Sequence, residues 1–280
     1  MLKLMYITNQ PEIARIAESA GADRIFVDME FIGKDARQKG LDTVKSHHTV
    51  EDAANIKRAV SKAEVLVRIN PIHTALPDYV SSADEIDAAI DAGADILMLP
   101  YFKTAAEVKE FVRLVGGRTT TMLLLETPEA VESVDEILTV PGIDEIHIGL
   151  NDLSLGYGMK FMFELLADGT VERLCLKFRR KGIRYGFGGI ASIGKGMLPS
   201  EYVIKEHYRL GSTCAILSRS FCDTTKITDI DTIKDTFTRG LEEIRRLEAE
   251  CELHSRYFYD NAREVRRLVG QIVNGADASC

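Results

Sequence analysis

A short pattern recurs along this chain: the end of a helix-like segment, then a glycine, then a brief apolar run. Copies begin at Ala20-Gly21, Ala92-Gly93, Pro141-Gly142 and Leu210-Gly211. A glycine just beyond the last helical turn is a common left-handed helix stop, and a short apolar run after it has the length of a buried strand. Each copy therefore predicts a helix that ends and a strand that begins.

Further apolar runs between these copies bring the predicted strands to eight. Helix starts are indicated by Ser82-x-x-Glu85, which has the form of a capping box, and by Thr127-Pro128, a cap followed by proline. The predicted strands lie near residues 2–8, 24–29, 65–70, 95–100, 121–126, 144–149, 183–188 and 213–218.

Strict alternation of strands and helices predicts a parallel sheet. Eight such units in about 220 residues favour a (β/α)8 TIM barrel, the α/β class, as the catalytic domain over residues 1–225. An open doubly wound sheet is the alternative, although no G-x-G-x-x-G follows the first strand. Residues 226–280 are predicted to form a C-terminal helical extension that packs on a neighbouring subunit, because the helical pattern over 229–273 exceeds the need of an eighth helix.

Composition excludes several classes of protein. The formal net charge of −8 disfavours a nucleic-acid partner. No apolar stretch reaches bilayer length, and the first residues lack the pattern of a signal peptide. Five cysteines without a C-x-x-C pair indicate reduced thiols. A cytoplasmic location without membrane contact is the resulting expectation.

Polar side chains follow most of the predicted strands, at the end where barrel enzymes carry their active sites. Glu126 and Asp152 follow neighbouring strands, and Glu126 comes directly after the apolar run at 122–125. Burying a lone carboxylate there is costly, and a cation shared by both carboxylates removes that cost. Oxygen ligands of this kind suit Mg²⁺ or Mn²⁺. A pair of structural salt bridges is the alternative interpretation.

The segments around these two carboxylates carry a resemblance. Residues 124–128, 134–138 and 142–154 are similar to the HpcH/HpaI aldolase and citrate lyase β-subunit family, and residues 22–30, 67–71 and 93–100 match it in order and spacing. The similarity covers about residues 10–220. It implies an oligomeric (β/α)8 barrel that makes or breaks carbon–carbon bonds next to a keto acid or an acyl-CoA thioester.

The resemblance also implies roles for individual residues. Glu126 and Asp152 would ligate a divalent metal, and Arg68 would stabilise an enolate. Backbone amides near Gly149, Leu150 and Asn151 would hold the substrate carboxylate, with Asn70 as a further substrate ligand. The predicted function is a class II aldolase that cleaves or forms a 2-keto acid through a metal-bound pyruvate enolate. Its partners would be a keto acid, an aldehyde and copies of itself in a trimer or hexamer.

This chain departs from the family at Phe31 and at Lys103. Aldolases of the family carry a histidine after the Asp-x-Glu element, where this chain has Phe31, so His47 or His48 is predicted to handle the proton. Lys103 is predicted to bind an anionic substrate, with a Schiff base as the lesser alternative.

Three other functions stay open at this point. One is a citrate lyase-like enzyme that acts on a CoA thioester. Another is a metal-free barrel that binds phosphate through the glycine-rich segment at 186–196. The third is a non-catalytic barrel.

Overall fold

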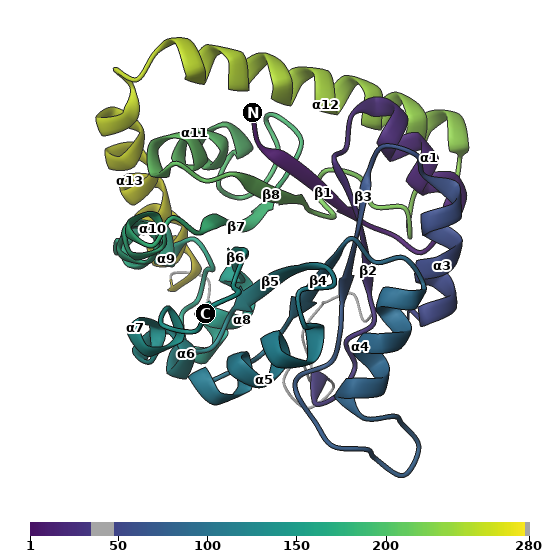
Figure 1. Ribbon diagram of the computed structural model, residues 1–280. Helices are drawn as coiled ribbons and strands as arrows, with labels where there is room; N and C mark the ends of the chain where they lie inside the picture. Colours follow the sequence, from purple (N-terminus) through teal and green to yellow (C-terminus); the bar gives the residue numbers. More distant parts are fainter. Residues whose placement is uncertain (35–47, 278–280) are drawn as a thin grey trace. The chain divides into compact units, whose positions relative to one another are not determined.

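The computed structural model describes residues 1–34 and 48–277. Its strands pair in chain order and close into a barrel (Figure 1), which confirms the predicted (β/α)8 fold. The strands are β1 (Lys3–Ile7), β2 (Arg24–Asp28), β3 (Glu64–Arg68), β4 (Ile96–Leu99), β5 (Thr120–Leu125), β6 (Glu145–Ile148), β7 (Arg184–Ile190) and β8 (Cys214–Leu217).

Helices follow the strands along the chain. Within residues 1–34 and 48–277, none of them combines the length and apolar character that a membrane crossing requires. The helices are α1 (Pro11–Ala20), α3 (Val50–Ala59), α4 (Ser82–Asp91), α5 (Ala105–Val115), α6 (Pro128–Glu132), α7 (Val134–Ile137), α8 (Leu150–Gly156), α9 (Glu164–Ala167), α10 (Thr170–Arg180), α11 (Ser200–Leu210), α12 (Ile230–Leu253) and α13 (Phe258–Asp277).

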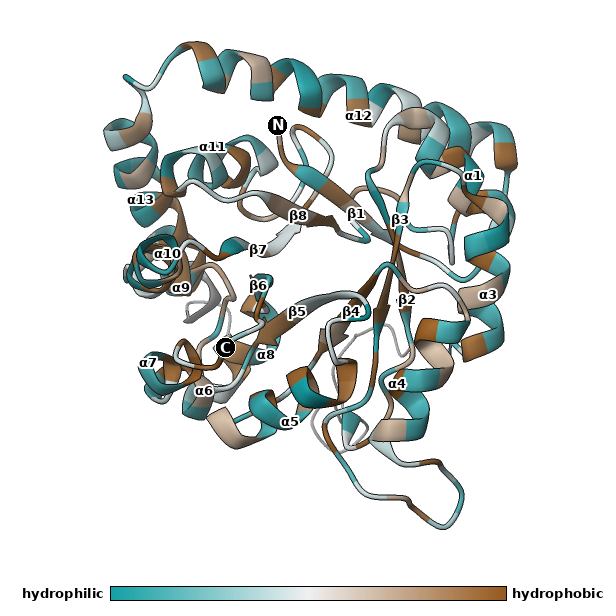
Figure 2. Ribbon diagram, viewed as in Figure 1, coloured by the Kyte–Doolittle hydropathy of each residue, from teal (hydrophilic) through white to brown (hydrophobic). Residues whose placement is uncertain are grey.

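The chain divides into two compact units, and the first comprises residues 6–125 and 129–146. Its strands are apolar and buried, whereas its helices turn polar residues outward (Figure 2). Strands β2 and β3 are parallel, and their register places Asp28 opposite Arg68 at the carboxyl ends of both strands. This register sets the position of the charged cluster described below.

The second unit comprises residues 1–5, 126–128 and 147–280. Helix α12 packs on α11, and α13 packs on α9 and α11. Where the sequence predicts one helical tail over 229–273, the structure has two helices, because His254 adopts an extended backbone (φ −136°, ψ 106°) after α12. The domain boundary near residue 225 and the packing of this extension on another subunit stay predictions.

The start of α4 differs from its prediction. The N-cap is Ser81, whose side chain accepts a hydrogen bond from the Asp84 amide, so the predicted capping box from Ser82 to Glu85 is wrong by one residue. The Ser82 hydroxyl instead contacts the His73 ring. Glu85 does not cap α4 and instead accepts hydrogen bonds from Asn70, just after β3.

Candidate functional site

A salt bridge joins the carboxyl ends of β2 and β3. The Arg68 guanidinium donates from Nε to Asp28 Oδ1 at 2.8 Å and from Nη2 to Asp28 Oδ2 at 2.7 Å. Such a bidentate pair fixes the plane of the guanidinium as well as its position. The Asp28 side chain is 2% exposed and that of Arg68 14% exposed. Arg68 is therefore held rigidly while part of its side chain stays accessible.

Lys34 joins the same cluster from the turn that follows β2. Its Nζ donates to Asp28 Oδ2 at 2.8 Å and lies 3.7 Å from Glu30 Oε2. Arg68 Nη1 lies 3.5 Å from the same Glu30 oxygen. Burial acts to raise the pKa of Asp28, but Arg68 and Lys34 outweigh it and hold that pKa well below its usual range. We refer to Asp28, Glu30, Lys34 and Arg68 as the β2–β3 charge cluster.

His48 borders this cluster. The backbone amide of Asp28 donates to His48 Nδ1 at 3.0 Å. That nitrogen must therefore carry no proton, and neutral His48 holds its proton on Nε2. Burial lowers the pKa of His48, with the charges of Asp28 and Asp52 opposing it. This tautomer makes Nε2 a hydrogen-bond donor, and the predicted role of His48 in proton transfer stays a prediction. His47, the other predicted histidine, lies outside the described residues.

Asn70 occupies a buried position beneath the same turn. Its Oδ1 accepts from the amides of Phe31 and Ile32 at 2.9 Å each. Its Nδ2 donates to Glu85 Oε1 at 2.8 Å. The residue is fully buried, so the geometry gives it the role of supporting the turn after β2. Direct contact with a substrate stays a prediction.

Phe31 stands where the resemblance predicts a histidine in related aldolases. Its ring is 40% exposed and meets the ring of Tyr79 edge-on, with centroids 4.8 Å apart. The Tyr79 hydroxyl donates to Glu85 Oε1 at 3.1 Å. Burial raises the pKa of Glu85, although bonds from Asn70 and Tyr79 oppose it. Aromatic packing thus takes the place of a titratable group at this position.

Lys103 follows β4 on the surface of the same unit. Its Nζ donates to Glu129 Oε1 at 2.8 Å and lies 5.6 Å from the centroid of the Tyr101 ring. The hydrogen bond to Glu129 raises the pKa of Lys103. Schiff-base chemistry needs a lowered pKa, so this environment disfavours the covalent alternative. Tyr101 has a left-handed backbone with φ of 49°, a feature that often accompanies functional sites.

Glu126 and Asp152, the predicted metal ligands, both belong to the second unit. Glu126 directly follows β5 and is 4% exposed. Asp152 lies in the first turn of α8, where its Oδ1 accepts from the Asn151 side chain at 2.9 Å. Gly156, at the other end of α8, packs so closely on Pro128 that a Cβ there would lie 2.7 Å from Pro128 Cδ. This contact fixes α8 against the segment that carries Glu126.

The predicted anion-binding backbone lies at the start of α8. The first helical hydrogen bond runs from the Leu153 amide to the Gly149 carbonyl at 3.1 Å. The amides of Leu150 and Asn151 therefore belong to the N-terminal end of the helix, the end that favours anions. Whether they bind a substrate carboxylate stays a prediction.

The glycines of β7 have a packing explanation. Gly188 has φ of +54°, and a Cβ there would lie 2.7 Å from Leu150 Cδ1. At Gly186 a Cβ would collide with the Cys214 carbonyl of β8. These two glycines let neighbouring segments approach, so the glycine-rich stretch does not by itself indicate phosphate binding.

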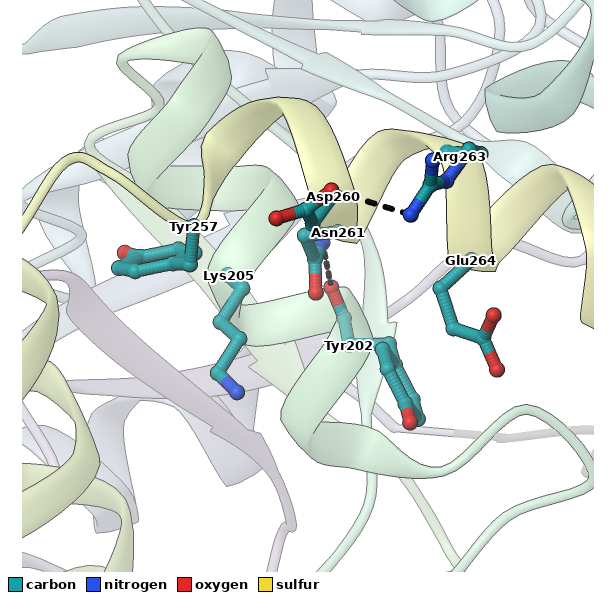
Figure 3. Close-up of a pocket in the computed structure, with 7 residues that line it drawn as sticks. All are labelled: Tyr202, Lys205, Tyr257, Asp260, Asn261, Arg263 and Glu264. Carbon is teal, nitrogen blue, oxygen red and sulfur yellow. Dashed lines mark hydrogen bonds and ion pairs between the residues drawn. The ribbon is translucent and has the colours of Figure 1, made fainter.

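A cavity of about 290 Å³ lies between α11 and the start of α13 (Figure 3). Lys205 reaches between the rings of Tyr202 and Tyr257, at 6.0 and 5.6 Å from their centroids. Asn261 donates to the Tyr202 carbonyl at 3.1 Å and to Glu206 Oε1 at 2.8 Å, which anchors α13 to α11. None of the predicted site residues that the structure describes lines this cavity, so we assign it no part in the candidate site.

Two members of this arrangement escape the sequence-based prediction, Lys34 and Glu85. Lys34 lies in the turn after β2, and Glu85 lies in the first turn of α4, where it accepts from Asn70. No periodic pattern reveals either contact. A signal for Lys34 does exist: Asp28 and Glu30 close an apolar strand, and burying two acids calls for nearby cations. The lysine four residues after Glu30 is the nearest one along the chain.

Comparison with known proteins gives consistent matches. The family model described as HpcH/HpaI aldolase/citrate lyase matches residues 3–183. A 4-hydroxy-4-methyl-2-oxoglutarate aldolase of Chaetomium globosum is 24% identical over 64% of this chain and 72% of its own length. A hydroxypyruvate/pyruvate aldolase of Rhizorhabdus wittichii is 28% identical over 41% of this chain and 59% of its own.

A solved structure shares the fold. The crystal structure of an HpcH/HpaI aldolase from Desulfitobacterium hafniense superimposes with a TM-score of 0.60 at 20% identity, covering 84% of this chain and 93% of that one. At this identity the likeness concerns the fold alone.

Proposed function

This chain belongs to the HpcH/HpaI aldolase/citrate lyase family, and from that premise we propose that it is a divalent-metal-dependent aldolase. Family membership supports a carbon–carbon lyase. The finer proposal is a class II enzyme that cleaves or forms a 2-keto acid through a pyruvate enolate. The observation that carries it is the rigidly held guanidinium of Arg68 at the end of β3, the group expected to stabilise the enolate oxygen.

The substrate class follows from the relatives. Their names describe aldolases that act on 4-hydroxy-4-methyl-2-oxoglutarate and on hydroxypyruvate or pyruvate. All of these compounds contain a 2-keto acid group. We therefore propose a keto acid and an aldehyde as the small-molecule partners, in a cytoplasmic homo-oligomer. Lys103 and the amides of Leu150 and Asn151 are the proposed contacts for substrate carboxylates.

The chemistry of Glu126 and Asp152 fits a hard divalent cation. Both offer carboxylate oxygens, the donors that Mg²⁺ and Mn²⁺ prefer. Among the described residues no group of three or more His, Cys, Asp or Glu side chains forms a metal cluster, and two protein carboxylates leave positions for water and substrate. When bound, the cation would act as a Lewis acid on the keto acid oxygens.

The chain's own residues would supply the remaining chemistry. Breaking the aldol bond leaves negative charge on the keto oxygen, and the guanidinium of Arg68, preorganised by Asp28, would stabilise that charge. His48 would donate a hydrogen bond to a substrate oxygen through Nε2–H, because its Nδ1 accepts from the Asp28 amide. Asn70 and Glu85 would keep the turn after β2 in place.

The first experiment follows proton exchange at pyruvate. The purified protein is incubated with pyruvate and Mn²⁺ in deuterated water, and loss of the methyl signal is followed by NMR with and without EDTA. We expect metal-dependent exchange, and a loss of at least about a hundredfold in Glu126→Gln and in Asp152→Asn. Glu110→Gln is the matched control, because Glu110 lies on the surface in an ion pair with Arg113.

Two outcomes would overturn the proposal. Exchange that persists unchanged in EDTA would argue against a metal-dependent enzyme. No exchange with any divalent metal would exclude the pyruvate enolate, and acetyl-CoA would then test the thioester lyase directly.

A further inference from the structure

The β2–β3 charge cluster combines two carboxylates with two cationic side chains. The exposed fractions of the side chains are 2% for Asp28 and Glu30, 5% for Lys34 and 14% for Arg68. Burying a carboxylate without a cation is strongly unfavourable. Arg68 brings one positive charge to two carboxylates, and Lys34 brings the second. Within these four side chains the formal charges therefore sum to zero.

The contacts show that Lys34 and Arg68 together compensate the charges of Asp28 and Glu30. Asp28 Oδ2 accepts from Arg68 Nη2 at 2.7 Å and from Lys34 Nζ at 2.8 Å. Glu30 Oε2 faces Arg68 Nη1 at 3.5 Å and Lys34 Nζ at 3.7 Å. Both cations thus contact both acids. Among the ion pairs of the described residues, removing Lys34 would leave Arg68 as the cation shared by both carboxylates.

This arrangement matters for a reaction that develops negative charge. The substrate is an anion, and the enolate adds charge at an oxygen that Arg68 is proposed to stabilise. Without the ammonium of Lys34, the charge of these four side chains would be negative by one unit, and that change opposes both the binding of an anion and the transition state. With Lys34 in place, the acids orient Arg68 without cancelling its charge.

We propose that Lys34 is a positioning residue for Arg68, whose ammonium offsets the second buried carboxylate so that the guanidinium can stabilise a developing oxyanion. This inference rests on the proposed function and deepens it. Lys34 lies in the turn after β2, three residues beyond Phe31, so a cation enters the segment from which the family's histidine is absent.

Three variants separate charge from packing. Lys34→Met keeps the length of the stem and removes the charge. Lys34→Arg keeps the charge. The double variant Glu30→Gln with Lys34→Met restores neutrality without the ammonium. The matched control is Lys57→Met, which breaks the half-exposed ion pair of Lys57 with Asp95 in the same unit.

The assay is the pyruvate exchange reaction, measured as kcat and KM, with circular dichroism to confirm folding. We expect Lys34→Met to lower kcat by about 10- to 100-fold and to raise KM for pyruvate. Lys34→Arg should retain most of the rate, and the double variant should recover most of what Lys34→Met loses. Lys57→Met should behave as the wild type.

The outcomes discriminate between this inference and the proposed function. A wild-type protein that does not exchange pyruvate refutes the proposed function and this inference with it. Exchange in the wild type together with an unchanged kcat in Lys34→Met refutes this inference alone. A folded Lys34→Met that loses activity, with no recovery in either Lys34→Arg or the double variant, also refutes it, because charge balance would then not be the cause.

Discussion

Replacing Asp28 by asparagine is the most direct perturbation of the β2–β3 charge cluster. Each oxygen of this carboxylate accepts two hydrogen bonds. Oδ1 accepts from Arg68 Nε at 2.8 Å and from the Glu30 amide at 3.2 Å, and Oδ2 accepts from Arg68 Nη2 at 2.7 Å and Lys34 Nζ at 2.8 Å. Whichever oxygen becomes an NH₂ group in Asp28→Asn will face two donors. No side-chain flip avoids this conflict.

The size of the effect follows from the burial. Asp28 is 2% exposed, and removing one partner of a buried ion pair costs about 3–5 kcal/mol, because the remaining charges lose their compensation. With a urea m-value of about 3 kcal/mol/M, the unfolding midpoint should fall by about 1–1.7 M. Since the folded state lowers the pKa of Asp28, its stabilising effect is present at neutral pH and fades as the pH falls through the folded value.

Urea unfolding at pH 7, followed by circular dichroism, measures this midpoint. Asp235→Asn is the matched control, because Asp235 forms an exposed pair with Arg239 on α12 and should leave the midpoint unchanged. In acid, the difference between wild type and Asp28→Asn should shrink as the wild-type carboxylate becomes protonated. A midpoint for Asp28→Asn equal to that of the wild type would refute the reasoning about the cluster.

Two further predictions concern His48 and Gly188. NMR titration of His48 should show a midpoint below the ordinary 6.5 and a neutral form protonated on Nε2, because burial lowers its pKa and Nδ1 accepts from the Asp28 amide; a proton on Nδ1 would contradict this geometry. Since the unfolded chain binds that proton more readily, His48 should lower stability as the pH falls below about 6.5. Gly188→Ala should lower the melting temperature through a strained backbone, about 1–2 kcal/mol, plus a contact of 2.7 Å with Leu150 Cδ1. Adding Leu150→Ala to Gly188→Ala should relieve only the contact with residue 150. An unchanged melting temperature in Gly188→Ala alone would count against both the backbone strain and the contact.

The barrel was predictable because its signal is local and repeated. Each strand begins within two residues of its predicted start, and a glycine helix stop followed by an apolar run marks the starts of β2, β4, β6 and β8. The capping box at Ser82 failed because two adjacent serines offer the same chemistry. In the structure Ser81 caps α4, and the Ser82 hydroxyl contacts the His73 ring.

The candidate site was predictable only in part. Arg68 and Asp28 stand at the carboxyl ends of strands, where (β/α)8 barrels carry their active sites. Substrate binding by Asn70 stays a prediction, and the structure adds a second role, because Asn70 Oδ1 accepts from the amides of Phe31 and Ile32. Such a role depends on how a loop folds back, which sequence spacing does not encode.

Phe31 stands where the resemblance predicts a histidine, and the contacts of Phe31 show what this position does instead. That position is committed to packing on Tyr79 and to a backbone hydrogen bond with Asn70, so proton transfer must use another group. Both His48 and Lys34 contact Asp28, the first through the backbone amide and the second through the carboxylate. Asp28 therefore links the guanidinium, the imidazole and the ammonium at the end of β2. If the enolate chemistry operates in this chain, replacing the Asp28 carboxylate should disturb both the positioning of Arg68 and the charge balance with Lys34, whereas the backbone amide that fixes the tautomer of His48 remains.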